Sequence, residues 1–259
     1  MDITLQNWFF FRFMTWIAIL SRFSGLFVVA PFFSGNLFPL RIKIPLTITL
    51  SFIVLYFVPD YIPMDLPVGD TFAIILINFI YGLSAGLVAN LMFFGLLFAG
   101  DIFGYQLGFA AANIFDPQSQ TQSVIVGQLV FLTGTYIFTI IKGPIILLGI
   151  LIESFNQVPA GIMAFEKDIA WNLSLVLGEV FVFGMKVGMP MIVFMLLVTV
   201  VLGIMAKLLP QLNVFIVGIP LKILVGLIIL IGLLPILAET MVRYTRELGD
   251  WISNTMNTF

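Results

Sequence analysis

Ionisable side chains are rare in this chain, and those close to its long apolar runs are the first candidates for chemistry. Charged residues make up 9% of the 259 residues, against roughly a quarter in a soluble domain. The charges that interrupt or border the apolar runs are Arg12, Arg22, Asp101, Lys142, Glu153, Glu179 and Lys186. Ionisable groups at membrane depth are costly, so each of these positions carries a functional hypothesis by default.

Glu179 and Lys186 suggest ion or solute movement. They are seven residues apart, so on a helix they share one face, about 10 Å apart along the axis. In a secondary transporter they would form a coupling or substrate pair near the membrane midplane. Equally, they could pair with other helices of a bundle or lie at depths that reach water. A transporter also predicts an inverted repeat between the two halves, which the sequence does not show.

Catalytic and metal chemistry has little support. The chain has no cysteine and no histidine, which excludes thiolate chemistry, Cys or His metal ligation and a serine–histidine protease. Asp101 follows Phe98-Ala99-Gly100, whereas aspartyl intramembrane proteases need Gly-x-Gly-Asp and a second embedded aspartate. No Walker loop or dinucleotide motif is present. We therefore expect neither an enzyme nor a cofactor.

A polar segment separates two long apolar runs. It reads Gly104-Tyr-Gln-Leu-Gly-Phe-Ala-Ala-Ala-Asn-Ile-Phe-Asp-Pro-Gln-Ser-Gln-Thr-Gln-Ser123. Irregular backbone cannot face lipid, because each unpaired N–H or C=O costs several kcal/mol there. This segment must leave the membrane, or be buried against protein at the wall or gate of a passage.

The elements around this segment are predicted to be membrane helices. The chain is 61% hydrophobic, with a mean hydropathy of +1.17, as in an all-α integral membrane protein. The formal net charge of −2 does not indicate a basic surface that binds nucleic acid. Apolar runs cover residues 8–29, 44–58, 71–100, 124–152 with a break at Lys142-Gly143-Pro144, 169–206, and 214–238.

The run 71–100 is too long for a simple span. As a helix it measures about 45 Å, whereas a bilayer core is about 30 Å thick. Small residues recur at the spacing that lets helix backbones approach closely: Gly82 and Gly86, then Gly100, Gly104 and Gly108. This helix is therefore predicted to pack mainly against protein.

The C-terminal part is predicted to be a hairpin followed by an amphipathic helix. The short connector that contains Pro210, Gln211 and Asn213 forces its neighbouring helices to be antiparallel. In the tail 239–259, apolar residues recur at spacings of three and four opposite charged residues. Such a tail suits an interfacial or partner-binding helix.

Several motifs in the same order resemble the FliR family of flagellar export-gate proteins and their virulence secretion counterparts. They are Gln106-Leu-Gly-Phe-Ala-Ala-Ala-Asn-Ile-Phe-Asp-Pro117, Arg22-x-x-Gly25 with Ala30-Pro31, Pro39-x-Arg41, Glu153-Ser-Phe155 with Pro159-x-Gly161, and Pro210-Gln-Leu-Asn-Val-Phe215 with Gly218-x-Pro220-x-Lys222. The resemblance spans nearly the whole chain.

The resemblance implies a structural subunit of a protein-export gate in the bacterial inner membrane, within the flagellar basal body. Implied partners are FliP-type and FliQ-type subunits, an FlhB-type switch protein and unfolded export substrates. It also implies a FliP-like unit at 1–168, a FliQ-like hairpin at 169–238 and the C-terminal helix at 239–259. Long helical hairpins would then pack in a heteromeric assembly, partly outside the bilayer plane.

By the same resemblance, the loop 106–122 acts as a plug across the closed channel. The plug residues are Gln106, Gly108, Phe109, Asn113, Ile114, Phe115, Asp116 and Pro117. Phe109, Ile114 and Phe115 would exclude water and ions, while polar side chains satisfy backbone groups at protein depth. Two alternatives stay open: the secondary transporter, and an assembly or insertion factor without a channel of its own.

Overall fold

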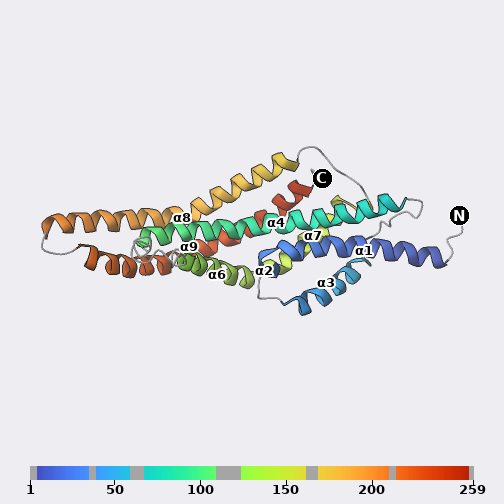
Figure 1. Cartoon of the computed structure of the whole chain (residues 1–259), viewed down its shortest axis with the longest axis horizontal. Coiled ribbons are helices and arrows are strands. Elements are labelled where there is room, and N and C mark those ends of the chain that lie inside the picture. The colour runs from blue at the N-terminus through green and yellow to red at the C-terminus, as the bar shows by residue number, and fades with distance from the viewer. Residues whose placement is uncertain are drawn as a thin grey trace. The chain divides into compact units, whose positions relative to one another are not determined.

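All the secondary structure described in the computed structural model is helical (Figure 1). The structure describes residues 5–34, 39–58, 67–108, 124–161, 169–209 and 214–256. Its helices are α1 (Leu5–Val29), α2 (Pro31–Ser34), α3 (Leu40–Val54), α4 (Val68–Leu107), α6 (Val124–Ile140), α7 (Gly143–Gln157), α8 (Ile169–Leu208) and α9 (Val214–Met256).

Four of these helices are long and apolar enough to cross a membrane. The candidate spans are Arg12–Val29, Gly69–Leu107, Leu177–Leu208 and Val217–Ile252, and the broken pair α6 and α7 is a possible fifth. The prediction of an all-α membrane protein is confirmed. α4 has 40 residues and is therefore about 60 Å long, so it exceeds the bilayer core by more than the run 71–100 suggested.

Proline and backbone geometry explain where several helices begin. Pro39 has an extended backbone (φ −63, ψ 148) and precedes α3, which begins four residues earlier than the apolar run suggested. Between α6 and α7, Lys142 is left-handed, with a φ of 61. Pro144 lies in the first turn of α7, where proline is favoured because its missing N–H would have no partner within the helix. The carbonyl of Lys142 accepts hydrogen bonds from the N–H groups of Ile145 and Ile146, which starts α7.

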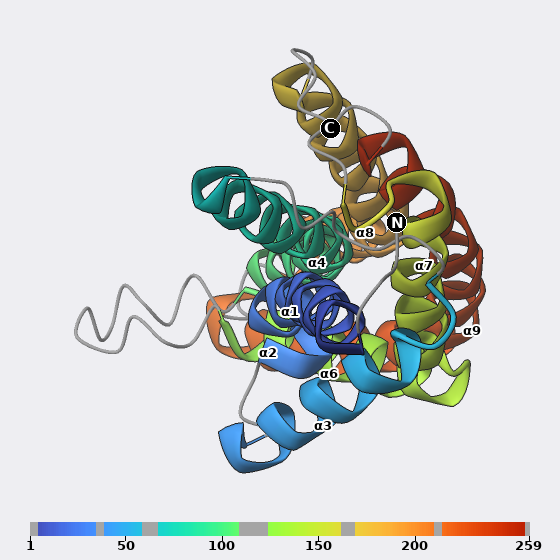
Figure 2. The same ribbon diagram turned by 90° about the vertical axis from the view of Figure 1, so that its right-hand side faces the viewer.

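The chain folds as two compact units that share its long helices. Unit 1 comprises residues 1–91, 142–177 and 245–259, and unit 2 comprises residues 92–141 and 178–244. In unit 1, α1 lies between α3 and the first part of α4 (Figure 2). Its core includes Ile19, Phe23 and Leu26 of α1, Tyr81 and Val88 of α4, and Leu147 and Leu151 of α7.

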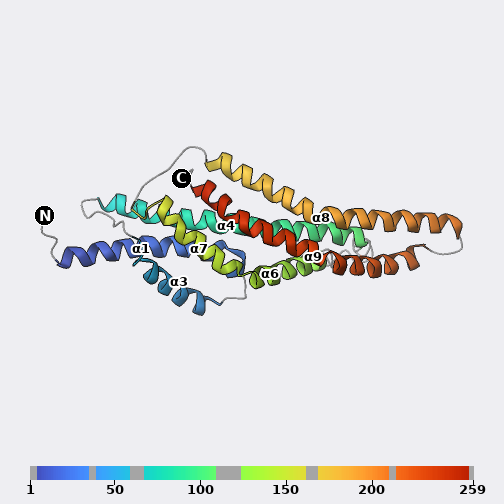
Figure 3. The ribbon, with the colours of Figure 1, turned by 180° about the vertical axis from the view of Figure 1, so that it is seen from behind.

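Unit 2 is built from the second part of α4, α6, and most of α8 and α9. α8 and α9 run in opposite directions on either side of the segment that joins them (Figure 3). The buried side chains of this unit include Phe93 and Phe103 of α4, Phe138 of α6, Phe183 and Met195 of α8, and Met241 and Tyr244 of α9. α9 continues past residue 239 without a break. The residues after 239 keep the helical spacing of apolar side chains, and no helix-breaking residue occurs at that point.

Candidate functional site

Arg22 is the most unusual side chain in unit 1, because a full positive charge lies in an apolar core with 0% exposure. It is on α1, and its Nε and Nη2 both donate to Oδ1 of Asn78 on α4, at 3.0 and 2.7 Å. Nη1 donates to Oγ of Ser154 on α7 at 3.1 Å. Nη2 also donates to the carbonyl of Val158 at 3.0 Å. One guanidinium therefore joins three helices and the segment after α7.

Aromatic rings and further hydrogen bonds complete this arginine centre. The guanidinium carbon lies 4.0 Å from the ring centroid of Phe155 and 5.1 Å from that of Tyr81, where the negative ring faces attract a cation. Asn78 Nδ2 donates to the carbonyls of Ile74 and Ala160 at 2.8 and 2.9 Å. The amide that accepts from Arg22 is thereby held in one orientation.

The contacts of the arginine centre explain how a buried charge is tolerated. Every acceptor that Arg22 contacts in the described structure is neutral: an amide oxygen, a hydroxyl and a carbonyl. A buried charge is tolerated when its donors are satisfied, and this arrangement uses the fork of arginine to do so. Its physical effect is to fix α1, α4 and α7 in one register.

Glycines bring α1 and α4 close enough for this network to form. A Cβ atom on Gly82 would overlap the carbonyl oxygen of Arg22, and one on Gly86 would lie 3.0 Å from the carbonyl oxygen of Leu26. On the α1 side, a Cβ atom on Gly25 would lie 2.7 Å from the backbone nitrogen of Leu83. These are backbone contacts, so no side-chain rotation relieves them.

The helix end that leads into the predicted plug lies in unit 2. Asp101 is half-buried on α4, and its Oδ1 is a buried atom that has no hydrogen-bond partner in the described structure. The Asp101 carboxylate lies against Gly127 of α6, where a Cβ atom would overlap it. A Cβ atom on Gly100 would lie 2.7 Å from the Cα of Gly127. The approach of α4 to α6 at this point therefore depends on small residues.

The described structure includes only the first residues of the predicted plug. Gln106 is half-buried in the last turn of α4, which continues to Leu107, so the predicted loop does not begin at 106. Gly108 follows the helix with a φ of 93. Gly104 is buried on α4. The other predicted plug residues, Phe109, Asn113, Ile114, Phe115, Asp116 and Pro117, lie outside the described residues, as do the connector residues Pro210, Gln211 and Asn213.

The remaining charged candidates do not converge on one site. Glu179 and Lys186 are both exposed on α8, and no ion pair joins them within the described residues. Lys186 Nζ instead donates to the hydroxyl of Tyr244 at 3.2 Å. Lys142 is exposed at the break between α6 and α7, and Glu153 is exposed on α7. The structure therefore gives no assembled transport pair.

The partners of Arg22 are not among the residues predicted from the sequence. Asn78 lies in an uncharged apolar run, and Ser154 lies inside the motif Glu153-Ser-Phe155. An arginine in an apolar run requires acceptors from other helices, and this requirement was the available signal. That requirement alone does not identify Asn78 and Ser154 among the polar residues of the chain.

Comparison with known proteins places the chain among export proteins. Residues 13–248 match the family described as "Bacterial export proteins, family 1". The chain is 34% identical over 222 residues to "Flagellar biosynthetic protein FliR" of Aquifex aeolicus, covering 84% of each chain. It is 29% identical over 224 residues to the protein of that name from Bacillus subtilis, covering 85% of each. With that of Escherichia coli it shares 25% identity over 244 residues, covering 92% of this chain and 90% of the relative.

Proposed function

The chain belongs to the FliR family of bacterial export proteins, and from this we propose that it is a structural subunit of the flagellar protein-export gate. The family match over residues 13–248 carries the proposal. As a family member with several membrane-spanning helices, the chain is a membrane protein of the flagellar export apparatus. The proposed location is the bacterial inner membrane, within the flagellar basal body.

The described helices support a subunit that works inside an assembly. In the apolar stretch Leu177–Leu208 of α8, 22% of the residues are buried within the chain. In the corresponding stretch Gly69–Leu107 of α4, 50% are buried. α4 is also longer than a bilayer core is thick. Exposed apolar surface on helices that extend beyond the membrane needs cover from protein. We propose FliP-type and FliQ-type subunits as that cover, with an FlhB-type switch protein as a further partner.

Within this assembly, the proposed role of the chain is to form the channel entrance and its plug. The segment 106–122, which begins in the last turn of α4, closes the channel and opens for unfolded flagellar subunits. Residues 1–168 act as a FliP-like unit, residues 169–238 as a FliQ-like hairpin, and residues 239–259 as the amphipathic C-terminal part, which continues α9. The arginine centre stabilises the fold, and the proposed role of the chain is structural rather than enzymatic.

The test of this function is a pull-down from the native cells. The chain carries a C-terminal tag, is extracted in mild detergent, and its companions are identified by mass spectrometry. Stable recovery of P-type and Q-type subunits is the expected result. Recovery of a monodisperse chain alone would contradict the gate and favour transport assays on Glu179 and Lys186. Partners that leave once assembly is complete would indicate an assembly factor.

Deletion of residues 108–122 tests the plug. We expect the shortened chain to assemble with its partners but to leave the closed channel permeable, because the segment that excludes water and ions is gone. The measurement is ion leakage across the membrane of cells that express the deletion, together with secretion of flagellar subunits. Unchanged leakage and unchanged secretion in an assembled gate would show that the segment is not a plug.

A further inference from the structure

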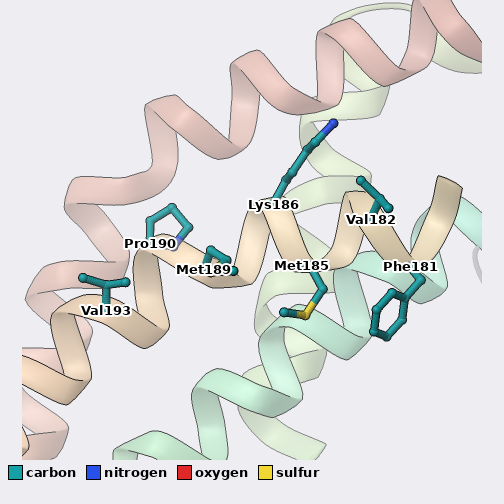
Figure 4. Close-up of a pocket in the computed structure, with 7 residues that line it drawn as sticks. All are labelled: Phe181, Val182, Met185, Lys186, Met189, Pro190 and Val193. Atoms are coloured by element: carbon teal, nitrogen blue, oxygen red, sulfur yellow. The ribbon is translucent and has the colours of Figure 1, made fainter. Parts of the chain in front are cut away.

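A groove on the exposed side of α8 is lined by six apolar residues and one charge. The lining residues in unit 2 are Phe181, Val182, Met185, Lys186, Met189, Pro190 and Val193, as Figure 4 shows. Four of the apolar ones, Phe181, Met185, Met189 and Val193, recur every four residues and therefore follow one row along the helix. Lys186 extends away from the helix axis with its nitrogen at the far end.

Lys186 is satisfied only in part within its own chain. In the described structure its Nζ donates one hydrogen bond, to the hydroxyl of Tyr244, and lies 5.8 Å from the ring centroid of that tyrosine. Tyr244 is 1% exposed, and its ring centroid lies 4.4 Å from that of Phe183. The tyrosine therefore holds the ammonium in place but is neutral. An ammonium has three donors and a full charge, and within the described residues Lys186 has no carboxylate partner.

Lys186 lies inside the long apolar stretch of α8. It lies nine residues inside the apolar window Leu177–Leu208, which is about 14 Å along the axis from Leu177. Glu179 lies only two residues inside that window, and the two charges are about 10 Å apart along the helix. Glu179 is therefore too far away to pair with Lys186, and it is close to the end of the apolar stretch.

We propose that a helix of a partner export subunit packs into this groove and places an aspartate or glutamate carboxylate against Lys186. This inference rests on the proposed gate function and specifies one contact within it. Lipid tails would cover the apolar row but leave the ammonium without a counter-charge. A carboxylate from a neighbouring helix supplies the missing charge, and Met185 and Met189 adapt to the shape of the partner helix.

The test is zero-length carbodiimide cross-linking of the complex purified in mild detergent from native cells, combined with variants of Lys186. An amide bond between Lys186 Nζ and a carboxylate of a different polypeptide, identified by mass spectrometry of the peptides, is the expected product. Lys186→Met keeps the apolar volume but removes the charge, and should reduce recovery of partner subunits at least tenfold. Lys186→Arg should retain them. Lys207→Met, at the exposed end of the same helix, is the matched control and should behave as wild type.

The outcomes separate this contact from the proposed function. Wild-type protein that recovers P-type and Q-type partners, with equal recovery by Lys186→Met, would overturn the contact and leave the gate standing. A Lys186 cross-link to a carboxylate of its own chain, or co-purified anionic lipid that is lost in Lys186→Met while the partners remain, would also overturn it. Failure of the wild-type chain to recover any partner would overturn the proposed function itself.

Discussion

Arg22→Met removes most of the folded protein from the membrane. Methionine fills a similar volume but donates no hydrogen bond, so Asn78 Oδ1, Ser154 Oγ and the Val158 carbonyl lose their donor. A buried polar group that loses its partner costs about 1–3 kcal/mol. Domains are stable by only about 5–15 kcal/mol. Losing several partners at once is therefore expected to lower steady-state protein at least tenfold, measured by immunoblot of membranes and by motility in soft agar.

Two further variants show whether the geometry of the arginine matters. Arg22→Lys keeps the charge, but a single ammonium cannot reproduce the fork that reaches Asn78 Oδ1, Ser154 and Val158 together. Its protein level should be intermediate. Arg12→Met removes an arginine from the same helix but outside the arginine centre, and should lower the level far less. Arg22→Met protein that accumulates and supports swimming like wild type would show that the centre is dispensable.

The helices could be predicted from the sequence because their signals are local. An apolar run of about 20 residues lies within a single helix, and prolines and glycines act within one or two turns of their own position. The predicted break at Lys142-Gly143-Pro144 is therefore present between α6 and α7, and α4 is longer than a simple span, as the run 71–100 indicates. The start of α3 was misplaced because Leu40, Arg41 and Lys43 precede the uniformly apolar stretch, yet all follow Pro39 and are helical.

The arginine centre could not be predicted because its contacts are remote in sequence. Arg22 meets Asn78 across 56 residues and Ser154 across 132 residues. Periodicity reports which face of a helix is apolar, but not which other helix covers it. The motif Glu153-Ser-Phe155 marked the right region, yet only the fold shows that Ser154 and Phe155 both contact the guanidinium. The role of the plug residues stays a prediction.

Gly82→Ala is expected to disrupt unit 1 although it adds a single methyl group. The new Cβ atom would overlap the carbonyl oxygen of Arg22, so α1 and α4 must move apart. Overpacking a core costs about 1–3 kcal/mol and occasionally more, and a backbone clash has no rotamer that relieves it. The same movement pulls the guanidinium of Arg22 away from Asn78 on α4. The expected result is a loss of membrane-inserted protein comparable to that of Arg22→Met, measured by the same immunoblot.

The control variant for Gly82→Ala is Gly149→Ala, which is not expected to lower the protein level. Gly149 lies on α7, and a Cβ atom there meets nothing within 4 Å. Alanine is preferred over glycine inside a helix by about 0.5–1 kcal/mol, so Gly149→Ala should leave the level unchanged or raise it. Because Gly82 contacts the backbone of Arg22, the effects of Gly82→Ala and Arg22→Met should be less than additive in the double variant. If the loss of protein in the double variant equals the sum of the losses in the two single variants, the close approach of α1 to α4 does not serve the arginine centre.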